Sequence, residues 1–320
     1  MIYEFRVSSF EFRVSSSERL PAWNSKLETR NSDKRTMVTN EQTGISKILI
    51  ATDGSVYSDA AVECGAWLAS RTAAQVTAMY VIDARRLAGH FIKHFSEIIS
   101  SRENEGFADR VRDYYRSHGT ETLARAAAIC ERRGVACRAR LESGNVVRML
   151  ADASSEVDLM VMGLRGEDEE YETGFLGSVA EQVLRKTRRP VLLNHLLFKE
   201  FRRALLAYDG SDAARRAMEM LAQLAVALEM EVDAVQLVEE GAETVALKDV
   251  LDYFQDFPVH VSAHYLIGDS HAVIIDHVKE NNCDLMAMGA YDNRLADSLA
   301  LGTTTEYLMR NSPVPVLVHH

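Results

Sequence analysis

Short apolar runs alternate with longer amphipathic segments from Lys47 onward. The first run, 48–51, ends in an Asp-Gly-Ser turn, after which apolar residues recur at helical spacing. Similar runs follow at 76–82, 136–141, 159–162 and 190–193. Helical patterns separate them at about 95–133, 146–153 and 178–186. Fully apolar strands that alternate with helices predict an α/β fold in which helices cover both faces of a parallel sheet.

The second half of the chain repeats landmarks of the first half in the same order, which indicates two related tandem domains. The corresponding pairs are 48–55 with 204–211, 158–163 with 284–289, 177–178 with 302–303, and 190–193 with 315–318. We expect a first domain over 46–196 and a second over 200–320. A long helical excursion over 85–116 belongs to the first domain alone.

The first 45 residues are polar and rich in Ser and Arg, and they contain EFRVSS twice. We interpret 1–45 as a poorly ordered extension. Two explanations remain open: a flexible tail, or a start codon assigned too early, with Met37 as the true start. The segment lacks the apolar core and small-residue cleavage site of a secretory signal.

Bulk composition restricts the partners. The 320 residues carry a formal charge of -11, which opposes general binding to nucleic acid or an anionic membrane. No apolar stretch approaches the roughly 20 residues that span a bilayer. The four cysteines form no CxxC pair, so we expect reduced thiols and a cytoplasmic location. His90 and His94 lie four apart but have no evident third ligand, so no metal site is predicted.

Ligands of open parallel sheets bind at the carboxyl ends of the strands. The Asp-Gly-Ser turn at 53–55 lies there, as does a glycine-rich loop that contains Gly163, Gly166 and Gly177 and leads into a helix at Ser178. Glycines let backbone N–H groups approach phosphate oxygens, and a helix N-terminus adds unpaired donors. The arrangement predicts a nucleotide polyphosphate as the ligand.

These residues resemble the universal stress protein family, whose nucleotide-binding members carry Gly-x2-Gly-x9-Gly-(Ser/Thr) after strand four and an aspartate that ends strand one. The resemblance extends from about Ser46 to the end of the chain. It implies two tandem five-stranded parallel sheets of order 3-2-1-4-5 with helices on both faces, the adenine nucleotide alpha hydrolase-like fold. It also implies ATP, with or without Mg²⁺, over strands one and four.

Carried over to this sequence, the resemblance assigns Asp53 to the nucleoside and the backbone of Val81 to adenine. The residues assigned to ribose and phosphate are Met162, Gly163, Arg165 and Gly166, and those assigned to the phosphate tail are Gly177, Ser178 and Val179. The family also dimerises through its last strands. Here the two copies would satisfy that contact as an intrachain pseudo-dimer, with a homodimer as the other arrangement.

Both copies depart from the family pattern. In the first, ten residues separate Gly166 from Gly177, and five of them are acidic. In the second, Asp292 replaces the second glycine, and a carboxylate there repels phosphate. We therefore expect the second domain to bind ATP weakly or not at all, although it keeps the equivalent residues Asp209, Gly289, Gly302 and Thr303.

Structural roles compete with these assignments. Asp53 and Asp209 also suit a turn that caps a helix, the glycines also suit tight turns, and Arg165 also suits a solvated surface. No Ser-His-Asp set, Cys-His set or Lys-bearing phosphate loop is evident. The sequence predicts a regulatory, stress-response ATP-binding protein with an unidentified protein partner and at most slow ATP hydrolysis. The alternative is a nucleotide-free interaction scaffold of the same fold; an adenylyl-transferring enzyme lacks its signature loops.

Overall fold

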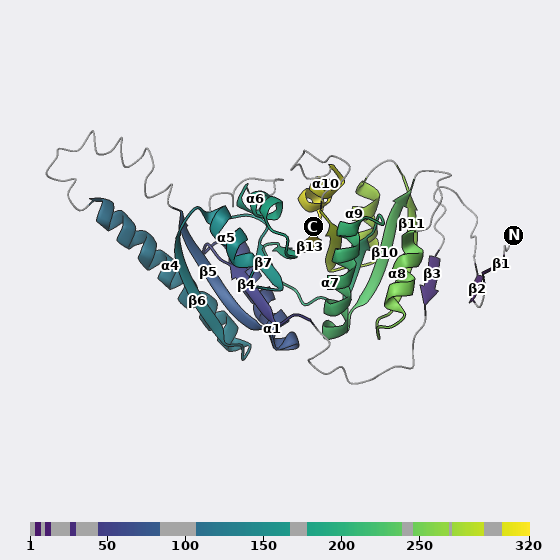
Figure 1. Ribbon diagram of the computed structural model, residues 1–320, viewed down its shortest axis with the longest axis horizontal. Coiled ribbons are helices and arrows are strands. Elements are labelled where there is room, and N and C mark those ends of the chain that lie inside the picture. The colour runs from purple at the N-terminus through teal and green to yellow at the C-terminus, as the bar shows by residue number, and fades with distance from the viewer. Residues whose placement is uncertain are drawn as a thin grey trace. The chain divides into compact units, whose positions relative to one another are not determined.

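A computed structural model describes three short strands near the N-terminus and most of the chain from residue 44. The described ranges are 4–7, 10–13, 26–29, 44–83, 107–166, 178–238, 246–268, 271–290 and 303–320. The chain divides into two compact units (Figure 1). One is Thr43–Glu200, and the other combines Met1–Gln42 with Phe201–His320.

The Thr43–Glu200 unit is built on a parallel sheet of order β6-β5-β4-β7-β8, which is the predicted order 3-2-1-4-5. Its strands are β4 (Lys47–Ala51), β5 (Gln75–Asp83), β6 (Cys137–Gly144), β7 (Leu159–Gly163) and β8 (Val191–Asn194). Its described helices are α1 (Val56–Thr72), α4 (Phe107–Arg132), α5 (Val146–Ser154) and α6 (Ser178–Lys186). Every residue of β7 is buried, as expected for a central strand covered on both faces, and every residue of β8 is buried as well.

Helices cover the sheet of this unit in two pairs. α1 and α4 contact each other, α1 packing on β4 and β7 and α4 on β5 and β6, while α5 and α6 form a second contacting pair (Figure 1). Ser55 begins α1, because its hydroxyl accepts the Ser58 N–H at 3.1 Å. Asn145 begins α5 in the same way by accepting from Arg148 N–H at 2.9 Å. These caps set where the chain leaves the carboxyl ends of β4 and β6.

The other unit repeats this plan. Its parallel strands have the order β11-β10-β9-β12-β13. They are β9 (Arg203–Ala207), β10 (Glu231–Val238), β11 (Val261–Ile267), β12 (Leu285–Gly289) and β13 (Val316–His319). Its described helices are α7 (Asp212–Leu228), α8 (Ala246–Phe254), α9 (Ala272–Glu280) and α10 (Thr303–Asn311).

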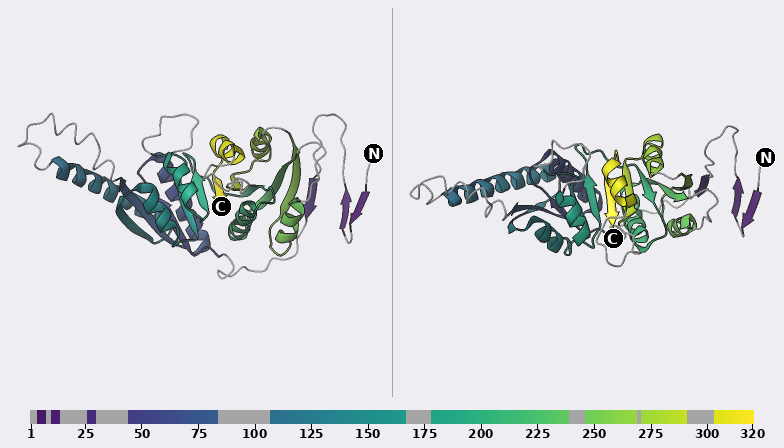
Figure 2. Two further views of the ribbon diagram at one scale, coloured as in Figure 1. Left: turned by 45° about the horizontal axis from the view of Figure 1, so that its top comes forward. Right: turned by 90° about the horizontal axis from the view of Figure 1, so that it is seen from above.

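A sixth strand, β3 (Lys26–Thr29), adds to this second sheet and was not predicted. It pairs antiparallel with β11, with Thr29 opposite Val261, and Figure 2 shows the two strands side by side. β1 (Glu4–Val7) and β2 (Phe10–Arg13) form a separate two-stranded antiparallel pair that contains the repeated EFRV segment. The short polar segment at 26–29 gives no strand signal, and its pairing depends on the edge that β11 offers.

Repeat-related carboxylates tie the starts of neighbouring strands together in each unit. Asp158 accepts the N–H groups of Ser46 and Lys47 at 2.8 and 3.0 Å, and Asp284 accepts those of Arg202 and Arg203 at 3.0 and 3.1 Å. Burial raises the pKa of Asp158, but these hydrogen bonds outweigh it, so the pKa lies below its ordinary value. At Asp284 burial dominates, and the pKa lies above its ordinary value. The same hydrogen-bond pattern is therefore accompanied by a lowered carboxyl pKa in the first copy and a raised carboxyl pKa in the second.

The predicted fold class is confirmed, and the strands beyond the predicted ten are the edge strand β3 and the separate β1–β2 pair. The predicted helix over 178–186 matches α6 in its bounds, and the strands agree within a few residues. The predicted helix over 95–133 corresponds to α4, which begins at Phe107 in the described part of the chain. Within the described residues, no helix combines the length and the apolar character needed to cross a membrane.

Candidate functional site

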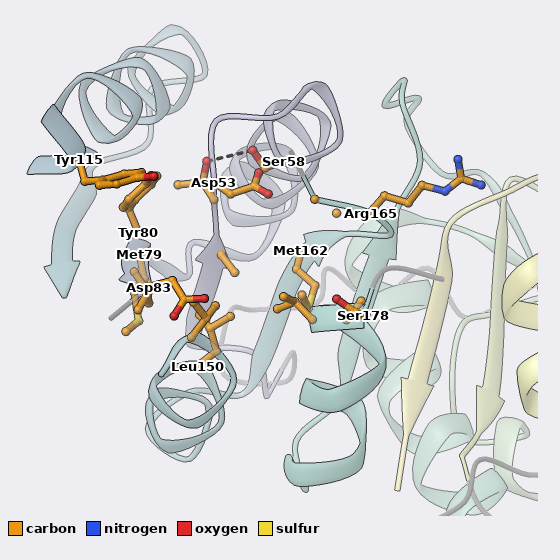
Figure 3. Close-up of a pocket in the computed structure, with 18 residues that line it drawn as sticks. Asp53, Ser58, Met79, Tyr80, Asp83, Tyr115, Leu150, Met162, Arg165 and Ser178 are labelled. Carbon is orange, nitrogen blue, oxygen red and sulfur yellow. Dashed lines mark hydrogen bonds between the residues drawn. The ribbon is translucent and has the colours of Figure 1, made fainter. Parts of the chain in front are cut away.

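A pocket of about 200 Å³ opens at the carboxyl ends of β4, β5 and β7 in the Thr43–Glu200 unit (Figure 3). Eight of the nine residues predicted for the first copy line it: Asp53, Val81, Met162, Gly163, Arg165, Gly166, Ser178 and Val179. The ninth, Gly177, lies outside the described residues, as does the acidic segment between Gly166 and Gly177. The structure thus brings together side chains and backbone from four separate parts of the sequence.

Asp53 forms the turn between β4 and α1. Its Oδ1 accepts the Ser55 N–H at 3.0 Å, and Ser55 in turn caps the helix. The second copy has the same turn, in which Asp209 Oδ1 accepts the Ser211 N–H at 2.9 Å. Both aspartates therefore have the structural role that competes with ligand binding. Unlike Asp209 in its own copy, Asp53 also lines the described pocket. There the Asp53 Oδ2 would lie 2.9 Å from a Cβ added to Gly166.

A network of hydroxyl groups fixes the wall behind Asp53. Ser58 Oγ lies 3.1 Å from Thr52 Oγ1, accepts the Gly54 N–H at 3.1 Å and donates to the Ser55 carbonyl oxygen at 2.9 Å. Gly54 has a φ of +90°, a conformation that L side chains rarely adopt. The Gly54 carbonyl oxygen accepts from the Arg125 guanidinium of α4 at 2.9 Å. The turn is therefore held from both sides and presents a preformed surface to a ligand.

Gly163 has a packing role that the second copy repeats. A Cβ on Gly163 would lie 2.8 Å from Tyr57 Cβ in α1. A Cβ on Gly289 would lie 2.5 Å from the backbone nitrogen of Ala214 in α7. Glycine is thus required at both positions because a helix lies against the end of the strand. The presence of Gly289 in the second copy therefore does not by itself indicate a second nucleotide site.

The first turn of α6 faces the same pocket. Ser178, Val179 and Ala180 all line it, and they are the first three residues of the helix. The first N–H groups of a helix have no partner within it, and the helix dipole places partial positive charge there. This end of the pocket suits an anion, and phosphate is a typical one.

The backbone of Val81 lies beyond the last residue of β4. The Thr52 N–H donates to the Met79 carbonyl oxygen at 3.0 Å, so the polar groups of Met79 face β4. Alternate residues of a strand face the same neighbour, and Val81 therefore presents its N–H and C=O on that side, past Ala51. A donor and an acceptor side by side at the pocket suit the edge of a heterocyclic base.

Arg165 lines the pocket without directing its charge into it. Its guanidinium carbon lies 5.9 Å from the centroid of the Tyr57 ring, a cation–π distance. Figure 3 shows its side chain pointing away from Asp53 and Met162. The predicted contact with phosphate can therefore involve the Arg165 backbone, whereas its guanidinium would have to rotate.

Several pocket residues were not predicted from the sequence. They are Ala51, Thr52, Ser58, Met79, Tyr80, Asp83, Tyr115, Val146, Leu150 and Ala180. Thr52 and Asp83 stand at the carboxyl ends of strands, a position that could have identified them. Tyr115 comes from α4, and no sequence signal separates it from the neighbouring Tyr114, which is exposed.

Asp53 and Asp83 are the carboxylates among the pocket residues, and one or two carboxylates with phosphate oxygens are a usual Mg²⁺ environment. The described residues contain no group of three His, Cys, Asp or Glu side chains arranged to hold a metal by themselves. His90 and His94 lie outside these residues. A magnesium ion here would therefore need further ligands from a bound molecule.

The second copy has a different residue at the position that corresponds to Thr52, which lines the pocket in the first copy. Tyr208 N–H donates to the Val235 carbonyl oxygen at 2.9 Å, the same contact that Thr52 makes with Met79. The pocket-lining threonine is thus replaced by a tyrosine that is 2% exposed. Thr303 begins α10 as Ser178 begins α6, whereas Gly302 and Asp292 lie outside the described residues.

Comparisons with known proteins agree with this architecture. The model of the universal stress protein family matches residues 44–195 and 239–320. A universal stress protein of Synechocystis sp. is 24% identical over 284 residues, which cover 85% of this chain and 99% of that protein. One of Methanocaldococcus jannaschii is 28% identical over 160 residues, 49% of this chain and 86% of that protein.

Solved structures give the same result. The crystal structure of a universal stress protein from Archaeoglobus fulgidus DSM 4304 aligns with a TM-score of 0.67 and 25% identity. The alignment covers 85% of this chain and 97% of that one. The family match over both ranges and the tandem sheets of order 3-2-1-4-5 together establish that this chain belongs to the universal stress protein family.

Proposed function

We propose that this chain is a regulatory adenine-nucleotide-binding protein and that its Thr43–Glu200 unit holds ATP. The observation that carries the proposal is the convergence of four sequence segments on one pocket at the end of a parallel sheet. Such a pocket occupies the position where open α/β sheets bind ligands.

The phosphates would lie between the loop at 163–166 and the first turn of α6. Ser178 and Val179 supply helix N-terminal N–H groups there, and Gly166 leaves room for phosphate oxygens beside Asp53. When bound, Mg²⁺ would neutralise part of the phosphate charge, and Asp53 and Asp83 are the carboxylates of the pocket lining that would help to hold it. Without such a cation these two carboxylates would oppose a polyphosphate.

The nucleoside would lie over β4 and β5. The N–H and C=O of Val81 would hydrogen-bond the edge of adenine, while Met79 and Leu150 provide apolar contacts to its faces. Tyr115 adds an aromatic ring from α4. A donor and acceptor pair set among apolar side chains is a typical arrangement for recognising a flat heterocycle.

A regulatory role fits the chemistry of the lining. Among the described residues, the pocket contains no histidine, lysine or cysteine that would act as a general base or nucleophile. ATP turnover would then depend on bound Mg²⁺ and an ordered water and would be slow. Occupancy by the nucleotide would instead alter binding to a protein partner.

A nucleotide-free scaffold of the same fold is the second candidate. The turn role of Asp53 and the packing role of Gly163 favour it, because folding alone accounts for both residues. The buried Tyr208 favours loss of binding in the second copy in particular. We therefore propose ATP binding for the first copy and weak or no binding for the second.

The repeat offers a matched pair of variants that test this proposal. Asn keeps the oxygen that accepts the turn hydrogen bond, so Asp53→Asn and Asp209→Asn each remove a charge and leave the turn intact. We expect Asp53→Asn to weaken binding of Mg·ATP to the full chain by about tenfold, typical for loss of one charged hydrogen bond, and Asp209→Asn to have no effect. Isothermal titration calorimetry measures both affinities.

Analysis of nucleotide released from the purified wild-type protein completes the test. ATP in the extract and a calorimetric titration with one nucleotide per chain support the proposal. A chain that is purified empty and gives no heat with ATP, ADP or AMP would favour the scaffold. A loss of affinity in Asp209→Asn alone would assign the nucleotide to the other copy.

A further inference from the structure

Two cysteines flank the turn that connects α4 to β6. Cys130 lies in the last turn of α4 and is completely buried, whereas Cys137 is the first residue of β6 and is partly exposed. The Cys130 carbonyl oxygen accepts the N–H groups of Arg133 and Val135, both at 3.0 Å. Gly134, with a φ of +70°, permits this tight reversal. The turn therefore brings the start of β6 back against the end of α4.

The surroundings hold both cysteines in place. Cys137 is in register with Val76 of β5, which fixes it in the sheet. At the other side of the turn, Glu63 of α1 accepts from Arg132 at 3.0 Å and from Arg133 at 3.2 Å. The end of α4 is thus anchored to α1 while β6 is anchored to β5. Cys137 lies on the same face of β6 as Leu141, whose Cδ1 would lie 2.7 Å from a Cβ on Gly119 of α4, so Cys137 is on the side of the sheet that α4 covers.

The pKa values of the two thiols shift in opposite directions because each thiol acts on the other. Interaction with the Cys130 thiol lowers the pKa of Cys137, against the opposing effect of burial. The same interaction, together with burial, raises the pKa of Cys130. The nucleophilic thiolate is therefore favoured at Cys137 rather than at Cys130, which keeps its proton.

The other two cysteines lack these properties. Burial raises the pKa of Cys64 strongly, and burial raises that of Cys283 to about 12. Cys64 is completely buried and Cys283 is 5% exposed. Among the four cysteines, Cys137 thus combines partial exposure, thiolate character and an adjacent second thiol, which is the usual arrangement of a redox-sensing cysteine beside its resolving partner.

We propose that Cys130 and Cys137 form a redox-active dithiol that hydrogen peroxide converts to an intramolecular disulfide. The Cys137 thiolate attacks one peroxide oxygen, and the O–O bond breaks. The leaving hydroxide takes a proton and becomes water, while Cys137 becomes a sulfenic acid. The Cys130 sulfur then attacks the Cys137 sulfur, the S–O bond breaks, and the released hydroxide takes the Cys130 proton. In sum, two thiols and one peroxide give one disulfide and two waters.

The disulfide would tie the end of α4 directly to the start of β6. α4 also carries Tyr115 into the pocket, and β6 pairs with the strand that carries Val81 and Asp83. The modification site therefore joins α4, which lines the pocket, to β6, the strand that pairs with pocket-lining β5. The proposal concerns the thiols alone and does not depend on which ligand the pocket takes.

Trypsin provides a direct test, because it cleaves after Arg132, Arg133 and Arg138, between and beside the two cysteines. The full chain is reduced, freed of reductant and treated with an equimolar amount of hydrogen peroxide. It is then quenched in acid, alkylated under denaturing conditions and digested. We expect the intact protein to lose the mass of two hydrogen atoms and peptides 126–132 and 134–138 to appear as one disulfide-linked species. Dithiothreitol should separate them.

Three variants define the roles of the thiols. Cys130→Ala should leave a sulfenic acid on Cys137 that dimedone traps, and Cys137→Ser should leave Cys130 reduced at the same peroxide dose. Cys64→Ala, the matched buried control, should form the linked species as the wild type does. If both thiols of the wild type are recovered alkylated, or if Cys137 proceeds to sulfinic acid without linkage to Cys130, the proposal is wrong. The wild-type mass decides this even if a variant fails to fold.

Discussion

Gly163 and Gly166 belong to one glycine motif but have different neighbours. A Cβ on Gly163 would lie 2.8 Å from Tyr57 Cβ and 2.9 Å from the Arg165 carbonyl oxygen, both of which are fixed by the backbone. A Cβ on Gly166 would instead meet a carboxylate oxygen of Asp53 at 2.9 Å. That atom is the end of a side chain and can move by rotation. Alanine should therefore strain the fold at Gly163 and disturb the pocket at Gly166.

We expect Gly163→Ala to destabilise the Thr43–Glu200 unit by about 1–3 kcal/mol, the usual cost of overpacking. For a unit of this size, that corresponds to a decrease in Tm of roughly 2–12 °C. Gly166→Ala should change the free energy of unfolding by less than about 0.5 kcal/mol. It should weaken ATP binding by about tenfold or more, because the methyl group occupies phosphate space and displaces Asp53.

Differential scanning calorimetry of the nucleotide-free full chain measures the first effect, and isothermal titration calorimetry with Mg·ATP measures the second. Equal decreases in Tm for the two variants, or an unchanged Tm for Gly163→Ala, would refute the argument that contact with α1 requires glycine. An unchanged affinity in Gly166→Ala, with the fold intact by circular dichroism, would refute the position given to the phosphates.

Further predictions concern residues outside the pocket. Gly289→Ala should destabilise the other unit by about 1–3 kcal/mol, because its Cβ would meet backbone atoms of α7. It should leave ATP affinity unchanged. Calorimetry measures both quantities, and a change in affinity would contradict the packing role. Asp158→Asn should cost about 1 kcal/mol at neutral pH, allowing for solvent exposure. Because the folded-state pKa of Asp158 is lowered, its contribution is present above the unfolded pKa and is lost as pH falls through the folded value. The pKa of Asp284 is raised in the fold, so stability that it contributes at acid pH is lost as pH rises. Urea unfolding at several pH values should therefore give opposite trends for Asp158→Asn and Asp284→Asn, and parallel trends would contradict both assignments.

The sequence predicted the fold well where local pattern and burial agree. α6 matches its predicted bounds because apolar residues at helical spacing follow the glycine-rich loop directly. β7 is fully buried and reads as an uninterrupted apolar run. β3 was not predicted, because its pairing depends on the edge of β11 rather than on its own residues.

The candidate site was predicted less completely. Residues within the motif segments converge as expected, but Asp83, Tyr115 and Leu150 reach the pocket from elements without a motif. Helical periodicity does not tell which exposed position of α4 turns toward a cavity. Nor does spacing separate the two glycines, because their roles depend on neighbours from α1 and from the turn at Asp53. The ligand roles of these residues remain predictions.

The exchange of Thr52 for Tyr208 between the copies has a consequence for how the protein would respond to its ligand. On the proposal that the first copy alone binds ATP, a single chain has no second equivalent site whose affinity the first could change. Its saturation curve should be hyperbolic, with a Hill coefficient of about one. Any steeper response to the cellular ATP level would therefore have to come from association of several chains.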